Sequence, residues 1–310
     1  MSADRFRGLY ASIICPMHPD GTLDAPGLEA HARQVLACPG LSGLLVNGHA
    51  GENVLLEREE ARQVVRIARR AAGDALIVAG VATESSAAAA RLARDAAEEG
   101  ADAIMIFAPF SWAPGVDPRV VLAHHRAVHD ATTLPLFLFQ GSVRSGGLFF
   151  PPEVLAELFR LPRAVAIKEG SWETDAYDTT RRLAARLRPE LAVMASGDEH
   201  LFACFALGSA GSLVSLAAVV PELVVALDEA VRRQDLPAAR ALHERLAPLA
   251  RAIYGTAPPG LATPRLKACL HLLGRLSSPA CRAPLPALGE AEYDALREAL
   301  ELAGVQGFAS

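Results

Sequence analysis

The segment LIVAGVATESSAAAARLARDAAEEGADAIMIFA, residues 76–108, has the pattern of a strand, a helix and a second strand. The short run Leu76–Val81 and the later run Ala103–Ala108 are apolar throughout, and the helical segment Ser85–Glu98 lies between them. Continuously apolar runs are typical of parallel strands that are covered by helices. Gly100 supplies the C-terminal cap that such a helix needs. The segment therefore predicts one strand–helix–strand unit of a parallel sheet.

The same unit recurs along most of the chain. Further apolar runs are Leu9–Cys15, Gly43–Asn47, Leu136–Phe139, Ala164–Lys168, Leu191–Ala195 and Ser212–Leu216, which makes eight in all. Eight strand–helix units in one series predict an α/β fold of the (β/α)₈ TIM-barrel type rather than an open doubly wound sheet. Only helical patterns follow the eighth run. We therefore expect a barrel over residues 1–235 and a C-terminal helical extension over residues 236–310.

Composition and charge exclude several classes of function. The chain has 310 residues, of which 51% are hydrophobic and 21% charged, as in ordinary globular proteins. Its net charge is −5 and it has no dense Lys/Arg tract, so nucleic acid and anionic membranes are poor candidate partners. The most hydrophobic stretch, Ala210–Val220, is too short to span a bilayer. The five cysteines are scattered and form no C-x-x-C motif, so we expect a cytoplasmic protein with reduced thiols.

Lysine is rare in this sequence. The 30 basic residues include only two lysines, Lys168 and Lys267. Lysine can lose its proton and act as a nucleophile, whereas arginine stays charged. Lys168 closes an apolar run, and the functional groups of a TIM barrel sit at the C-terminal ends of its strands. There, desolvation lowers the pKa of the amine, which can form a Schiff base with a ketone. The alternative is an ion pair with Glu169 or another acid at the rim of the barrel. For Lys267 we expect a structural role.

Two loops carry further candidate residues. In GHAGEN, residues 48–53, the glycines allow backbone N–H groups to converge on an anion such as a carboxylate. His49 is a candidate proton carrier because imidazole titrates near neutrality, and Glu52 alternatively anchors the loop. The spacing is not G-x-G-x-x-G, so no dinucleotide-binding motif is present. In the loop of residues 139–146, Arg144 is suited to bidentate capture of a carboxylate, unless it is simply one of many surface arginines.

Taken together, these segments resemble the dihydrodipicolinate synthase / N-acetylneuraminate lyase family of class I lyases. The resemblance covers nearly the whole chain, from Phe6 to Val305. Residues 48–53 resemble the family's G-T-T-G-E-[SG] loop, and residues 166–171 resemble its G-[IVL]-K-[ED]-[AS]-[ST] segment around the Schiff-base lysine. Residues 196–198 resemble its S-G-[DN] turn, and residues 211–215 its strand-eight segment.

The resemblance implies a lyase that binds pyruvate or another 2-oxo acid as an imine on Lys168. It places the backbone of Gly48, Ala50 and Gly51 around the substrate carboxylate, and Arg144 at the distal anion. Leu213, in the strand-eight segment, becomes a substrate contact. No cofactor or metal is expected, and the family's oligomers suggest a homotetramer or dimer.

The sequence also departs from the family pattern. His49 and Ala50 stand where the family loop has two threonines. Phe139 stands where the strand-five tyrosine shuttles protons, and Ser111 follows Phe110 where the family has two further tyrosines. We therefore expect His49, Ser111 or a water molecule to carry protons, with Phe139 and Ser111 in contact with substrate. Synthesis of dihydrodipicolinate is not expected.

Three functions remain open at this point. The leading one is a Schiff-base lyase that catalyses aldol cleavage, condensation or dehydration of a 2-oxo acid. The second is a non-catalytic or regulatory 2-oxo acid binder. The third is a metal-dependent enzyme on the same barrel, whose candidate ligands are His49, Glu52, Asp198 and His200. We expect His124, His125 and His129 to lie on the outside of the barrel, solvated or at an interface, and Trp172 to line the pocket or pack its rim.

Overall fold

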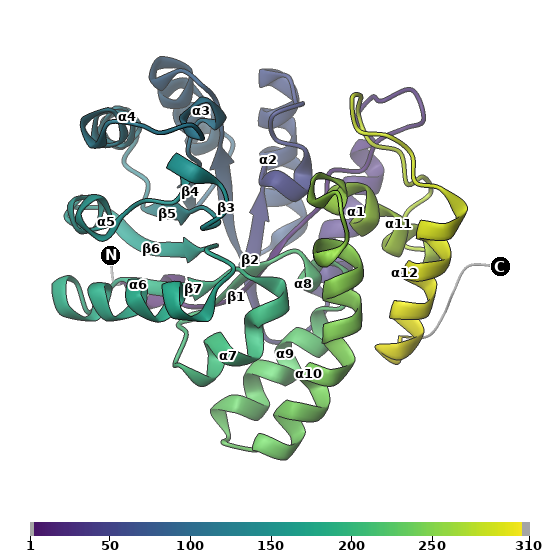
Figure 1. Ribbon diagram of the computed structural model, residues 1–310. Coiled ribbons are helices and arrows are strands. Elements are labelled where there is room, and N and C mark those ends of the chain that lie inside the picture. Colours follow the sequence, from purple (N-terminus) through teal and green to yellow (C-terminus); the bar gives the residue numbers. More distant parts are fainter. Residues whose placement is uncertain (1–2, 306–310) are drawn as a thin grey trace.

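The computed structural model describes residues 3–305. Its parallel strands form a closed barrel in sequence order (Figure 1). The strands are β1 (Gly8–Ser12), β2 (Leu41–Val46), β3 (Leu76–Val81), β4 (Ala103–Ile106), β5 (Leu136–Gln140), β6 (Ala164–Glu169), β7 (Ala192–Ala195) and β8 (Gly211–Val214). This confirms the TIM barrel. The strands begin and end within a few residues of the predicted runs, because each run is buried from both faces.

Helices surround the barrel and continue after it. They are α1 (Ala25–Leu36), α2 (Arg58–Ala72), α3 (Ser86–Glu98), α4 (Pro118–Ala131), α5 (Pro152–Phe159), α6 (Thr174–Leu187), α7 (Leu201–Ala206), α8 (Leu216–Val219), α9 (Pro221–Arg232), α10 (Leu236–Ala250), α11 (Ala262–Leu272) and α12 (Glu290–Leu302). The sequence pattern does not predict α1, since Pro26 and Gly27 resemble a loop. In the structure the Asp24 side chain accepts a hydrogen bond from Gly27 N at 2.9 Å and caps the helix.

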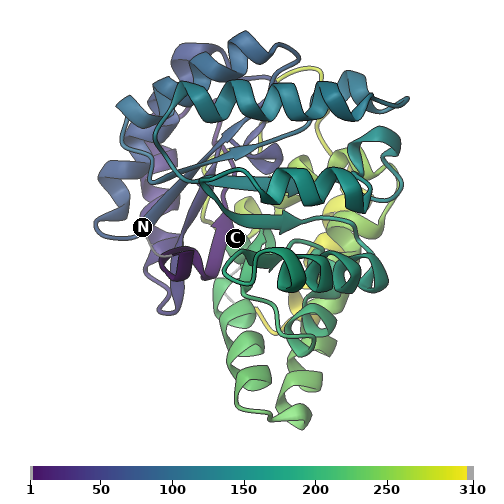
Figure 2. The ribbon, with the colours of Figure 1, turned by 90° about the vertical axis from the view of Figure 1, so that its left-hand side faces the viewer.

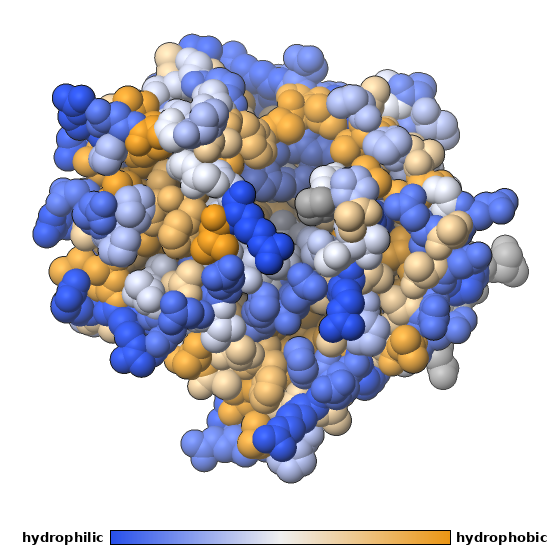
Figure 3. Space-filling view, viewed as in Figure 1, coloured by the Kyte–Doolittle hydropathy of each residue, from blue (hydrophilic) through white to orange (hydrophobic). Residues whose placement is uncertain are grey.

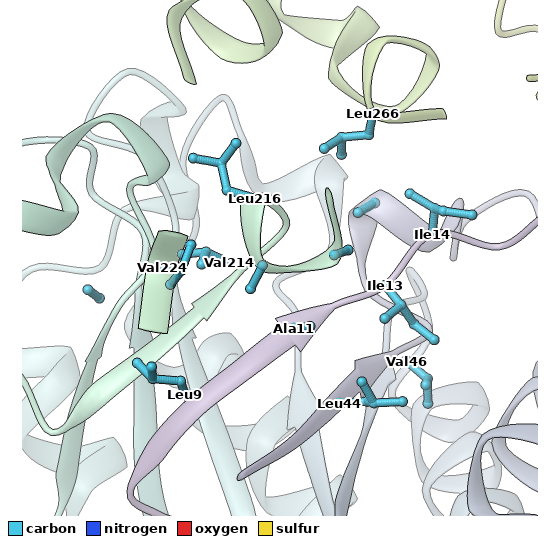
Figure 4. Close-up of a cluster of buried hydrophobic side chains, with 14 of the residues drawn as sticks. Leu9, Ala11, Ile13, Ile14, Leu44, Val46, Val214, Leu216, Val224 and Leu266 are labelled. Carbon is cyan, nitrogen blue, oxygen red and sulfur yellow. The ribbon is translucent and has the colours of Figure 1, made fainter. Parts of the chain in front are cut away.

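The core has two layers, one inside the barrel and one between the sheet and its helices. The inner cluster includes Tyr10, Phe137, Met194 and Leu213, all fully buried. The outer cluster is drawn in part in Figure 4, where Leu266 of α11 lies above the strands near Leu216 and Ile14. Because side chains alternate between the two faces of a strand, residues two positions beyond an inner residue point into the barrel mouth. Lys168 follows Ala166 of the inner cluster in this way.

The C-terminal helices place one helix over the barrel mouth. α9 and α10 pair and extend away from the barrel, in light green in Figure 2. Pro248 lies inside α10, and its missing N–H removes one helical hydrogen bond. The helix then continues as a π-helical turn, Arg251–Gly255. From there the chain enters α11, which contacts α8 and the turn His49–Gly51 at the mouth.

The expectation that His124 and His125 lie on the outside of the barrel, solvated or at an interface, is wrong. His124 and His125 of α4 are buried, at 2% and 0% exposure, because they pack against Trp112 and Phe150.

Figure 3 shows a surface with hydrophilic side chains spread widely and a hollow near the centre of the face that it draws. Among the described residues, no helix is long and apolar enough to cross a membrane.

Candidate active site

A cavity of about 290 Å³ opens at the C-terminal ends of the strands. Its walls come from strand ends, from the loops after them, and from the C-terminal segment. The lining includes Ser12, His49, Ala50, Phe110, Phe139, Ser142, Ser145, Lys168, Trp172, Ser196, Asp198, Ser215, Tyr254, Thr263 and Leu266. This is the place where the barrel fold puts its functional groups. It brings Lys168, His49, Ala50 and Phe139 together, as the sequence predicts.

Lys168 is a half-buried amine that opens onto this cavity. On β6 it pairs in register with Phe139 of β5, and its Nζ lies 5.9 Å from the centroid of the Phe139 ring. Burial lowers the pKa of Lys168 below its ordinary value of 10.5, and the charge of Asp198 opposes the shift. No described carboxylate lies within 4.0 Å of the amine. The lowered pKa leaves a larger fraction of the amine neutral and nucleophilic.

Glu169, the alternative partner for Lys168, faces the other way. It is 2% exposed, and it accepts hydrogen bonds from the hydroxyls of Ser171 at 2.8 Å and Thr180 at 3.4 Å. Burial raises its pKa to about 7. The interpretation of Lys168 as a rim ion pair with Glu169 is therefore wrong.

Asp198 is the carboxyl group on the cavity wall. It follows β7 in a short turn, Asp198–His200, and its Oδ1 accepts a hydrogen bond from Leu216 N at 2.8 Å. Burial raises the pKa of Asp198, while the Leu216 N–H and the Lys168 charge act in the opposite direction. A carboxyl group with a raised pKa beside an amine with a lowered one is the arrangement that proton transfer requires.

Tyr254 is the site residue that sequence reasoning missed. It lies in the π-helical turn after α10 and lines the same cavity as Lys168. Its hydroxyl is buried next to the Asp198 carboxyl and the Ser215 hydroxyl, without a hydrogen bond of good geometry to either. Its ring packs on Trp172, with centroids 5.2 Å apart. The available signal was Pro248, since an in-helix proline marks a local change in helix geometry.

The backbone of Trp172, in the same part of the cavity wall, is strained. It has φ of 64°, in the left-handed region that non-glycine residues rarely adopt. Such strain persists only where surrounding structure enforces it, and it concentrates at functional sites. Trp172 therefore lines the pocket, one of the two roles considered for it.

His49 lies in the cavity wall. Its ring lies against those of Phe107, Phe110 and Phe139, with centroids 4.4, 5.5 and 5.7 Å away, while the residue as a whole is exposed at the barrel mouth. Contact with these rings desolvates one side of the imidazole and lowers the pKa of His49, and the Lys168 charge adds to the effect. The role of His49 as a proton carrier stays a prediction.

The loop of residues 48–53, predicted to bind a substrate carboxylate, has one of its N–H groups already hydrogen-bonded within the protein. Residues His49–Gly51 form a 3₁₀ turn in which Gly51 N–H donates to Gly48 O at 2.9 Å. Gly51 is thus not a free donor. The N–H groups of His49 and Ala50 have no acceptor among residues 3–305, and both residues line the cavity. These two groups remain available for an anion.

Comparisons with known proteins agree with this geometry. The model of the dihydrodipicolinate synthetase family matches residues 5–303. The chain belongs to that family. It is 32% identical over 295 residues to the 4-hydroxy-tetrahydrodipicolinate synthase of Methanothrix thermoacetophila, covering 95% of this chain and 96% of the relative. It is 34% identical over 285 residues to 4-hydroxy-tetrahydrodipicolinate synthase 1 of Streptomyces coelicolor, covering 92% and 89%.

A solved structure extends the comparison. The chloride-inhibited dihydrodipicolinate synthase of Acinetobacter baumannii, in complex with pyruvate, has a TM-score of 0.85 and 26% identity to this chain, covering 97% of this chain and 99% of that one. Members of the family are Schiff-base, pyruvate-dependent lyases of the class I aldolase type. This family member is therefore an enzyme of the class I aldolase type.

Two residues predicted to contact substrate lie elsewhere in this family member. Ser111 is exposed and does not line the cavity, because its backbone N–H donates to Glu84 at 3.1 Å and holds it on the outside. Leu213 is fully buried in the inner core of the barrel, since its place on β8 is too far from the mouth. Neither Ser111 nor Leu213 lines the cavity within the described chain, and their roles as substrate contacts stay predictions.

Arg144 borders a second, outer cavity of about 650 Å³. This cavity shares Ser142, Ser145, Trp172 and Tyr254 with the inner one, so the two adjoin. The Arg144 side chain is exposed, and no described carboxylate lies within 4.0 Å of it. It thus borders the outer cavity and not the one that Lys168 lines.

A buried ion pair fastens the carboxylate loop to the C-terminal helices of this family member. Lys267 of α11 pairs with Glu52, and both side chains have 0% exposure. Lys267 Nζ also donates to Ala280 O at 2.8 Å, and Glu52 Oε2 accepts from Arg282 N at 2.7 Å. Glu52 has φ of 58°, which these contacts hold in place. The structural roles expected for Lys267 and Glu52 are confirmed.

Replacing Lys267 should destabilise the protein strongly. In Lys267→Met the Glu52 carboxylate stays buried without its partner, a change that typically costs about 3–5 kcal/mol. We expect the free energy of unfolding, measured by urea denaturation, to fall by that order. Arg126→Ala, at an exposed position of α4, should change it little. Equal stability of Lys267→Met and wild type would show that the pair does not hold the loop.

Proposed function

We propose that this protein forms an imine between Lys168 and pyruvate or another 2-oxo acid, and that its reaction is not the synthesis of 4-hydroxy-tetrahydrodipicolinate. The observation that carries the proposal is the Lys168 amine, with its lowered pKa, at a cavity of substrate size. The pyruvate complex of the Acinetobacter baumannii relative supports the choice of a 2-oxo acid.

The first steps follow from the residues around Lys168. The neutral amine attacks the ketone carbon and forms a C–N bond, while the carbonyl electrons move to oxygen, which takes up a proton. Loss of water from this carbinolamine gives the imine. The free N–H groups of His49 and Ala50 are suited to hold the substrate carboxylate, and the outer cavity with Arg144 has room for the rest of the molecule.

The aromatic wall argues for a reaction other than the synthase reaction. Phe139 and Phe110 offer no hydroxyl to the cavity, and His49 and Ala50 offer none in place of the two loop threonines. The proton carriers expected at these positions in the family are therefore absent from this chain's sequence. Turnover assays for aldol cleavage, condensation and dehydration would identify the reaction. A trapped imine without turnover in any of them would favour the alternative of a non-catalytic or regulatory 2-oxo acid binder.

The metal-dependent alternative receives no support from side-chain placement. Within residues 3–305, no three His, Cys, Asp or Glu side chains are grouped so that they could hold a metal ion. Of its candidate ligands, Glu52 is taken up by Lys267 and Arg282. Retention of activity in a chelator would agree with the imine proposal.

Lys168→Ala should abolish the adduct that cyanoborohydride traps with pyruvate, because the nucleophile is gone. Lys168→Arg should behave identically, since arginine keeps its proton. Mass spectrometry of peptides measures both, with the melting temperature as a control for folding. In wild type the added mass belongs on the Lys168 peptide; finding it on Lys267 instead would contradict the assignment.

The ascending limb of the pH profile of trapping should have its midpoint well below the ordinary lysine pKa of 10.5. The reason is that only the neutral amine attacks, and burial makes Lys168 neutral at a lower pH. The rate of adduct formation with pyruvate, followed across pH, gives the midpoint. A midpoint at or above 10.5 would contradict a desolvated amine.

Arg144→Ala should raise KM for 2-oxo acids that carry a second, distal carboxylate by about 10–150-fold, the loss of a charge-assisted hydrogen bond of roughly 1.5–3 kcal/mol. Trapping of pyruvate itself should not change, because Arg144 borders only the outer cavity. Arg126→Ala serves as the matched surface control. An unchanged KM for every dicarboxylic substrate would make Arg144 a surface residue without a role.

A further inference from the structure

We propose that the Asp198 carboxyl and the Tyr254 hydroxyl are the proton carriers of this active site, with the phenol supplied by the C-terminal segment. This inference rests on the proposed imine at Lys168. It assigns the protons of that chemistry to two side chains, one of which comes from outside the barrel strands.

The inner cavity, which Lys168 lines, also holds a phenol. Tyr254 is the only tyrosine among the described residues that line it. Its hydroxyl is buried, yet it makes no hydrogen bond of good geometry within the described chain. Buried hydroxyls are nearly always paired, so this one is suited to a partner that arrives with the substrate.

Asp198 lies near Lys168 without forming an ion pair with it. It lines the same cavity as Lys168, but its oxygens and the Lys168 amine are not within 4.0 Å of each other. The two groups interact through their charges without forming a locked ion pair. Because the Leu216 N–H holds one carboxyl oxygen, the group has a fixed orientation at the cavity wall. A substrate carbonyl bound at Lys168 therefore has an acid nearby.

The other side chains near Lys168 are mostly aromatic. Phe139 offers only its ring, and the His49 ring lies against those of Phe107, Phe110 and Phe139. The titratable neighbours of Asp198 are Lys168 on β6 and Tyr254, with Glu199 and His200 following it in its own turn and His49 elsewhere in the cavity wall. Among these, Asp198 and Tyr254 adjoin each other, so one can pass a proton to the other.

The proton balance of imine formation then closes on these groups. The protonated Asp198 carboxyl gives its proton to the ketone oxygen as Lys168 Nζ bonds to carbon. The resulting carboxylate takes the proton that the new C–N nitrogen loses. Asp198 then gives this proton to the departing hydroxyl, which leaves as water while the C=N bond forms. Tyr254 carries the proton where the substrate oxygen is nearer to the phenol than to Asp198: its hydroxyl gives its proton to that oxygen and takes the Asp198 proton, which leaves the balance unchanged.

Single-turnover trapping tests the proposal. With pyruvate and cyanoborohydride, Tyr254→Phe and Asp198→Asn should form the Lys168 adduct about 10²-fold or more slowly than wild type, the usual loss for a general acid–base. The final adduct should still map to Lys168. Tyr293→Phe, a half-buried tyrosine of α12 outside both cavities, should trap at the wild-type rate.

A rescue separates proton transfer from packing. Adding Phe139→Tyr to Tyr254→Phe returns a phenol to the cavity next to Lys168 from another wall, and it should recover at least tenfold of the lost rate. A packing defect at Tyr254 would not be rescued in this way. Melting temperatures show whether each variant is folded.

The outcomes distinguish this inference from the proposed function. Wild-type trapping rates in both Tyr254→Phe and Asp198→Asn, with a normal Lys168 adduct, would overturn the proton carriers and leave the imine standing. The same holds if slow Tyr254→Phe is not rescued by Phe139→Tyr. Absence of any adduct in wild type would overturn the proposed function, and this inference with it.

Discussion

The buried ion pair between Glu52 and Lys267 joins the two halves of the active site. One half is the barrel mouth, where Glu52 ends the loop that carries His49 and Ala50. The other is the C-terminal segment, which adds Tyr254, Thr263 and Leu266 to the cavity wall. A charge pair with no exposure to water is expensive to break, because either partner alone would be left buried. The two sides of the cavity wall are therefore held together by this ion pair as well as by packing.

The two lysines show how surroundings decide what one side chain does. Lys267 meets a carboxylate and a carbonyl oxygen, so its charge is fully satisfied and it is fixed in place. Lys168 meets a phenyl ring and a carboxyl group beyond ion-pair distance, so burial works against its charge. The first environment stabilises the protein and the second prepares a nucleophile. Rarity in the sequence pointed to both residues but could not tell these roles apart; position on the strand did.

The sequence predicted what depends on local pattern. The strands, most helices and Lys168 follow from runs of apolar residues and from the place where a run stops. Residues whose role depends on distant neighbours could not be read in this way. Tyr254 reaches the cavity only through the π-helical turn, and the rings in contact with His49 come from β5 and from the segment after β4. The division of the chain at residue 235 and its assembly into oligomers stay predictions.

The π-helical turn after Pro248 has a consequence for how such a site can diverge. A phenol mounted on a barrel strand is tied to the register of the sheet, so moving it disturbs the core. A phenol mounted after the last barrel strand can be gained, lost or shifted by a small change in helix winding, while β1–β8 stay as they are. Lys168 and Asp198 belong to the barrel, whereas the Tyr254 phenol belongs to the segment after it. The phenol can therefore change while the barrel stays the same, provided that the residue facing Glu52 is kept.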